Sequence, residues 1–92
     1  MSRPPNIIFI GKKPIMTYVN ATLTLLSNEP VVTIKARGKS ITTAVDVSQM
    51  IIKRLNTVGY KVSGVRIFSE RMTSHDGKER NVSTIEVDVS RP

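Results

Sequence analysis

The sequence predicts a single α+β domain of two layers, in which two helices pack on a four-stranded mixed sheet. Apolar residues recur at every second position in some segments and at every third or fourth position in others. These patterns follow one another in the order β-α-β-α-β-β, and the last two strands form an extended hairpin arm. Because a chain of 92 residues builds one modest core, we expect residues 1–92 to be one domain, with residues 1–5 flexible.

The first two segments are an apolar strand and an amphipathic helix. Residues 6–11 read NIIFIG, a run typical of a strand covered on both faces, which predicts a central place in the sheet. Pro14 suits the first turn of a helix, which we place at about residues 14–27, before Pro30. The helix's inward residues recur at three-to-four spacing and are Ile15, Val19, Thr22, Leu23 and Leu26.

The second strand, between residues 31 and 37, has one apolar and one basic face. Its apolar face carries Val32, Ile34 and Ala36. Its opposite face carries Thr33, Lys35 and Arg37. Same-face residues of a strand lie roughly 6.6 Å apart, close to the roughly 6–7 Å between neighbouring phosphates of a nucleic-acid strand. The basic face therefore matches a row of phosphates.

A second helix follows after a break at Gly38. Ser40 can cap its N-terminus, and we expect the helix to span about residues 41–56. Its main stripe comprises Ile41, Ala44, Val45, Ser48, Ile51, Ile52 and Leu55. Val47 and Met50 fall outside that stripe, so we expect this helix to contact something beyond its own core.

The remaining residues predict a hairpin with a polar tip. Residues 60–72 read as a long strand in which the alternation skips a position at Gly64, which indicates a bulge. Residues 81–89 alternate cleanly and form the partner strand. Between them, residues 73–80 read TSHDGKER, and the Asp-Gly pair is a strong signal for a tight turn.

The charge balance predicts an anionic partner. Lysine and arginine number 14 against 7 acidic residues, a formal net charge of +7. Hydrophobic residues make up 39% of the chain, so a folded domain carries this charge, not a disordered tail. Such a basic small domain is typical of proteins that bind nucleic acid.

Other classes of protein are disfavoured. The chain has no cysteine for a disulfide, a thiolate or a metal site, and its only histidine, His75, lies in the predicted turn. Glu86 and Asp88 share a strand face that looks like exposed surface, so no catalytic set can be assembled, and we expect neither an enzyme nor a cofactor. Residues 7–10 are too short an apolar run for a signal peptide or a membrane span, so we expect a cytoplasmic protein.

The triplet Gly38-Lys39-Ser40 matches the end of the phosphate-binding loop of nucleotide hydrolases. That loop needs a glycine five residues before Gly38, where this chain has Thr33 inside a predicted strand. A nucleotide site is therefore disfavoured. The turn still offers N–H groups and cations to another phosphate.

Three groups of basic residues form the candidate binding site. Lys12 and Lys13 precede the first helix, where cations oppose the helix dipole unless an anion is bound nearby. The second group lies at the end of the second strand and comprises Lys35, Arg37 and Lys39. The third group flanks the hairpin tip and comprises Arg71, Lys78 and Arg80. If the two strand-to-helix turns are neighbours, the first two groups share one edge of the fold.

The alternative for each group is a solvated charged surface without a ligand. Asp76 and Glu79 beside the tip keep that alternative open for the arm. Aromatic residues form only 4% of the chain and do not cluster with the cations in sequence, which disfavours a binder that stacks single-stranded bases. Contact with a duplex backbone fits better, and a basic two-stranded arm can follow or enter a groove.

Three segments resemble the Alba family of archaeal chromatin proteins. They read NIIFIGKKPIMTYV, VTIKARGKSITTAVD and RMTSHDGKERNVSTIEV, and the resemblance extends over roughly residues 6–89. It implies the same β-α-β-α-β-β fold, a homodimer, and a non-enzymatic protein that binds double-stranded DNA without sequence preference. Such a protein coats, bridges or compacts chromosomal DNA and is associated with the chromosome.

The resemblance also implies roles for individual residues. DNA contacts carry over to Lys12 and Lys13, to Arg37 and Lys39, and to Arg80 and Lys78 in the arm. The family's acetylated lysine corresponds to Lys12. Some members have a phenylalanine near the end of the second helix where dimers meet on DNA, and this chain has Leu55 there. A mixed dimer with a paralogue, and RNA binding in RNA folding or processing, remain alternatives.

Overall fold

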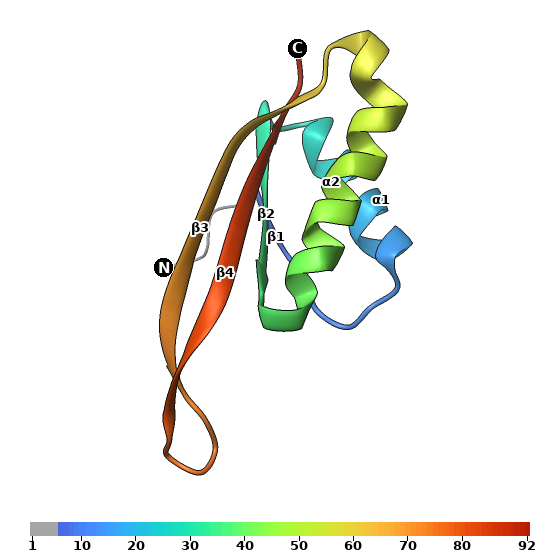
Figure 1. The fold of residues 1–92 in the computed structure, drawn as a ribbon. Coiled ribbons are helices and arrows are strands. Elements are labelled where there is room, and N and C mark those ends of the chain that lie inside the picture. The colour runs from blue at the N-terminus through green and yellow to red at the C-terminus, as the bar shows by residue number, and fades with distance from the viewer. Residues whose placement is uncertain (1–5) are drawn as a thin grey trace.

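A computed structural model describes residues 6–92, apart from the side chain of Asn56. It confirms the α+β order β-α-β-α-β-β, with both helices on one face of a four-stranded mixed sheet (Figure 1). The strands are β1 (Ile7–Phe9), β2 (Val31–Arg37), β3 (Lys61–Thr73) and β4 (Glu79–Ser90). The helices are α1 (Ile15–Leu26) and α2 (Ile41–Leu55), and the 3₁₀ turns are η1 (Gly38–Ser40) and η2 (Asn56–Val58). The expected flexibility of residues 1–5 lies outside the described residues.

The strand order in the sheet is β1-β2-β4-β3. β1 runs parallel to β2, and both β2 and β3 pair with β4 in antiparallel fashion. The prediction that residues 6–11 form a central strand is therefore wrong, because β1 is an edge strand. A run of apolar residues indicates that both faces of a strand are apolar, but it does not identify the strand's neighbours. β2 and β4 hold the central places.

The core lies between the sheet and the helices. The predicted alternation of β2 is confirmed, with Val32, Ile34 and Ala36 buried and the residues between them only half-buried. The prediction for Val47 is wrong: its side chain is completely buried in the core, and Met50 packs partly against the same core. α2 contacts α1 as well as the sheet, so its buried arc is wider than one apolar stripe.

β3 and β4 continue past the rest of the sheet as a two-stranded arm (Figure 1). β2 ends at Arg37, opposite Thr84, whereas the β3–β4 pairing continues to Thr73 and Glu79. The radius of gyration is 14.0 Å and the longest dimension is 48 Å. A compact domain of this length would have a radius of gyration of about 12 Å, so the arm accounts for an elongated molecule.

Glycines determine the two irregular points of the hairpin. At the tip, Gly77 has φ +81° and donates its N–H to the carbonyl of Ser74, which confirms the predicted turn. The predicted bulge is also confirmed, because the register shifts between Val62 and Gly64. A Cβ atom on Gly64 would lie 2.9 Å from a carboxylate oxygen of Asp88, so a larger residue would push that side chain away.

Candidate nucleic-acid interface

The sheet topology brings all three basic groups to one end of the molecule. β1 and β2 are parallel neighbours, and the Ile10 N–H donates to the Lys35 carbonyl at 2.9 Å, so the turns that follow them are adjacent. The arm projects beyond the same end because β4 is antiparallel to β2 (Figure 1). We call this end, formed by residues 11–14, residues 37–40 and the arm, the basic end. The expectation that the two turns are neighbours is confirmed.

A buried tyrosine shapes the loop that carries Lys12 and Lys13. The Tyr18 hydroxyl accepts hydrogen bonds from the backbone N–H groups of Gly11, at 2.8 Å, and Lys13, at 2.9 Å. Both lysines are exposed, whereas Tyr18 is buried. The first turn of α1 has no acidic residue, and Pro14 at its N-cap makes no side-chain cap. The helix N-terminus therefore keeps its positive potential beside two lysines.

The Gly38-Lys39-Ser40 triplet forms the short turn η1 between β2 and α2. Gly38 has φ +55°, a left-handed conformation that glycine adopts without strain. Lys39 is exposed, and the first turn of α2 contains no acidic residue. The turn thus adds a second uncompensated helix start to the basic end.

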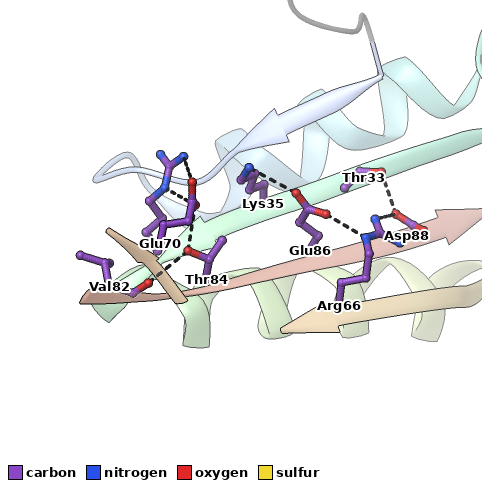
Figure 2. Close-up of polar contacts among 9 residues, drawn as sticks. Thr33, Lys35, Arg66, Glu70, Val82, Thr84, Glu86 and Asp88 are labelled. Atoms are coloured by element: carbon purple, nitrogen blue, oxygen red, sulfur yellow. Dashed lines mark hydrogen bonds and ion pairs between the residues drawn. The ribbon is translucent and has the colours of Figure 1, made fainter. Parts of the chain in front are cut away.

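Lys35 and Arg37 lie on the sheet face opposite the helices, which we call the open face, and both have carboxylate partners. Figure 2 shows Lys35 beside Glu86. Lys35 Nζ lies 3.2 Å from Glu86 Oε2 and 5.7 Å from the centre of the Phe68 ring. Arg37 Nε lies 2.9 Å from Glu70 Oε1. Within the described part of the chain, these two cations thus differ from Lys12, Lys13 and Lys39, for which no ion pair is found.

Arg66 completes a charge network on the open face. Its guanidinium donates to Glu86 at 2.8 Å and to both oxygens of Asp88 at 2.8 Å, and Thr33 donates to Asp88 at 2.7 Å (Figure 2). The expectation that Glu86 and Asp88 form an exposed surface is wrong, because their side chains are only 19% and 18% exposed. Hydrogen bonds from Arg66 lower the pKa of both carboxyls below their usual range.

The arm carries Arg71, Lys78 and Arg80, all exposed. Strand alternation places Arg80, paired with Met72, on the open face and Arg71 on the opposite side of the arm. Arg71 lies 3.6 Å from Glu79, an exposed pair that contributes little. Lys78 follows the tip of the hairpin. The Asp76 carboxylate accepts a hydrogen bond from the Lys78 backbone N–H, at 3.1 Å, and another from the Ser74 hydroxyl.

Two residues that matter for this site were not singled out from the sequence. In the sequence, Tyr18 stood out only as one of few aromatic residues. Buried tyrosine hydroxyls in proteins are hydrogen-bonded, so the available signal was that the Tyr18 hydroxyl needs a partner nearby. Glu70 was one of several scattered acidic residues. Its partner Arg37 is 33 residues away, and only the strand register brings the two together.

Among residues 6–92, no group of three or more histidine and acidic side chains is placed to hold a metal ion. In the same residues, neither helix has the length and apolarity needed to cross a membrane.

The fold and its basic end define a small two-layer α+β domain with a projecting β arm and basic residues gathered at one end. The Alba family model matches residues 6–69. A DNA/RNA-binding protein Alba from Nitrosopumilus maritimus is 55% identical over 84 residues, which cover 91% of this chain and 88% of that protein. The chain belongs to the Alba family. This membership confirms the predicted family and the prediction that the chain is not an enzyme.

Two further relatives agree. A DNA/RNA-binding protein Alba from Methanocella arvoryzae is 40% identical over 88 residues, covering 95% of this chain and 91% of that protein. The solved structure of Alba from Thermoplasma volcanium superposes with a TM-score of 0.84 at 41% identity, covering 94% of this chain and all of that chain. The similarity therefore extends through the arm, beyond the residues that the family model matches.

Proposed function

We propose that this protein binds double-stranded DNA without sequence preference and, as a dimer, coats, bridges or compacts chromosomal DNA. The observation that carries the proposal is the gathering of Lys12, Lys13, Lys39 and the basic arm at one end of the fold. Cations directed at the phosphate backbone supply affinity that does not depend on base sequence. Two uncompensated helix starts at the same end add to this attraction.

The names of the relatives support nucleic acid as the ligand. The N. maritimus and M. arvoryzae proteins are called DNA/RNA-binding, and this chain aligns with them over nearly its full length. We infer the same class of ligand here and, from it, a cytoplasmic location on the chromosome. Lys12, exposed at the start of the loop, is the proposed site of acetylation, which would remove one charge from the basic end.

An exposed apolar edge supports the proposed dimer. Val65 and Ile67 of β3 are 56% and 77% exposed, and strand pairing places them on the helix side of the sheet, where neither helix covers them. Ile67 also lines a hollow of about 350 Å³, together with Ile41 and Ile85 among others. Burial of this edge against a second copy would remove exposed apolar surface from water. A mixed dimer would use the same edge.

Leu55 is the proposed contact between neighbouring dimers on DNA. It is the last residue of α2, and its side chain packs partly against the core, so only part of it is accessible to another dimer. A smaller accessible apolar surface than that of a phenylalanine predicts weaker contact and less cooperative coating.

A salt titration of DNA affinity tests the proposal. Binding driven by counterion release predicts that log K falls against log salt with a slope of about −0.9 for each phosphate neutralised. A double variant, Lys12→Ala with Lys13→Ala, should weaken binding to unrelated duplex sequences equally and make the slope shallower. The matched control removes Lys53 and Arg54, which lie in the last turn of α2 at the opposite end. Equal effects of the two double variants would contradict the proposed site.

RNA is the second candidate ligand, because both named relatives are described as DNA/RNA-binding. A role in RNA folding or processing predicts that an RNA duplex competes successfully with a DNA duplex of the same length. Competition at physiological salt decides between them, and a clear preference for RNA would replace the chromatin role.

A further inference from the structure

Glu70 ties the end of β2 to the root of the arm. Arg37 is the last residue of β2 and pairs with Thr84, while Glu70 of β3 pairs with Val82, two residues nearer the hairpin tip on β4. Arg37 reaches across β4 and donates Nε to Glu70 Oε1 at 2.9 Å and Nη2 to Oε2 at 3.4 Å. The bridge therefore joins β2 to β3 at the level where the arm continues alone.

A second donor holds the carboxylate in place. The buried Thr84 hydroxyl donates to Glu70 Oε1 at 3.0 Å (Figure 2). Two hydrogen bonds lower the pKa of Glu70, and the one from Arg37 has a larger effect than the one from Thr84. The carboxyl is therefore ionised at neutral pH. Arg37 and Glu70 side chains are nevertheless 38% and 30% exposed, so solvent and a ligand reach both. An ion pair this exposed is weak enough to exchange partners.

A phosphate presents the same fork of oxygens to a guanidinium as a carboxylate does. We propose that Glu70 is an internal competitor for phosphate at Arg37, so that a duplex engages Arg37 only by displacing the Glu70 carboxylate. This inference rests on the proposed function. Displacement leaves an unpaired negative charge beside the duplex, so engaging Arg37 adds almost no net charge neutralisation. Glu70 thereby limits affinity at the root of the arm.

The test is Glu70→Gln, which keeps the side-chain shape and removes the charge. Its control is Glu29→Gln, which changes the net charge equally but lies before β2, at the end opposite the basic end. Relative to that control, Glu70→Gln should tighten duplex binding by about two- to fivefold for each Arg37 that reaches a phosphate. The salt slope should become steeper by about 0.9 for each such Arg37. Adding Arg37→Ala should remove both gains.

The opposite results separate this inference from the proposed function. If Glu70 only holds the arm in a binding-competent position, Glu70→Gln will bind more weakly than the control and the inference is overturned. If Glu70→Gln and Glu29→Gln have equal duplex affinity and equal salt slope, the inference is also overturned. The proposed function survives both of these results as long as the wild-type protein binds DNA. Absence of duplex binding by the wild-type protein would instead remove the proposed function itself.

A measurement on the wild-type protein covers the case in which Glu70→Gln folds poorly. The ¹⁵Nε resonance of Arg37 reports the partner of the guanidinium, because its shift depends on the hydrogen bond that this N–H donates. We expect the resonance to move when a saturating duplex is added. A resonance that stays at its free position in the complex would show that Arg37 keeps Glu70, which overturns the inference.

Discussion

The Tyr18 hydroxyl organises the lysine loop, and its removal should weaken both the fold and the binding of DNA. Tyr18→Phe deletes one oxygen that accepts two backbone hydrogen bonds, from Gly11 at 2.8 Å and from Lys13 at 2.9 Å. A typical hydrogen bond contributes about 1 kcal/mol net. Both donors lie in an exposed loop where water replaces part of the loss, so we expect destabilisation of about 1–2 kcal/mol in total.

This loss is measurable by thermal unfolding followed by circular dichroism. For a domain of this size, about 1–2 kcal/mol corresponds to a fall in Tm of about 5–10 °C. Duplex affinity, measured by fluorescence anisotropy at fixed salt, should fall about three- to tenfold because Lys12 and Lys13 must then be ordered on binding. The salt slope should not change, since no charge is removed.

Tyr60→Phe is the matched control. It removes the same atom from a tyrosine that follows η2 and packs partly against the core, away from the lysine loop. Similar losses of stability and affinity in both variants would refute the reasoning. A Tyr18→Phe protein with unchanged affinity would show that the hydroxyl does not preorganise the loop.

Three other variants test the core, the open face and the dimer edge. Val47→Ala should lower the free energy of unfolding by about 2 kcal/mol in chemical denaturation, because this side chain is fully buried; an unchanged midpoint would contradict the packing. Ionised Glu86 and Asp88 have lowered pKa values in the folded chain, so their stabilisation is present above the unfolded pKa of about 4 and is lost as pH falls through the folded values. Arg66→Ala should therefore reduce the difference in Tm between pH 6 and pH 3, and an equal difference in both proteins would count against the network. Ile67→Asp should give a monomer in sedimentation velocity with an unchanged circular dichroism spectrum; a dimer that persists would exclude the proposed edge.

Sequence patterns predicted the elements well because each pattern is local. The alternation around Val32 identified both faces of β2, and the skipped position at Gly64 identified the bulge. Strand order was not predictable in the same way. The NIIFIG segment is apolar on both faces, and nothing within it distinguishes a central strand from the edge position that it occupies in the sheet.

The site was predicted only in part, for a similar reason. The adjacency of the two turns follows from the parallel direction of β1 and β2, which the alternation of strands and helices indicates. The partners of Lys35 and Arg37 depend on the register of β4 and β3 against β2, which spans more than thirty residues of sequence. In the sequence, Lys35 and Arg37 cannot be distinguished from Lys39 as candidate phosphate contacts. In the structure, Lys35 and Arg37 are paired with carboxylates of the same chain, whereas no ion pair of Lys39 is found among residues 6–92.

The separation of the two ends of the sheet also makes the protein convenient to label. The chain contains no cysteine, so Asn28→Cys would create a unique thiol. Asn28 is exposed and lies in the segment between α1 and β2. This segment is at the end of the molecule opposite the lysine loop and the arm (Figure 1). A fluorophore attached there would sit clear of the basic end and report on duplex binding without occupying the residues proposed to contact DNA.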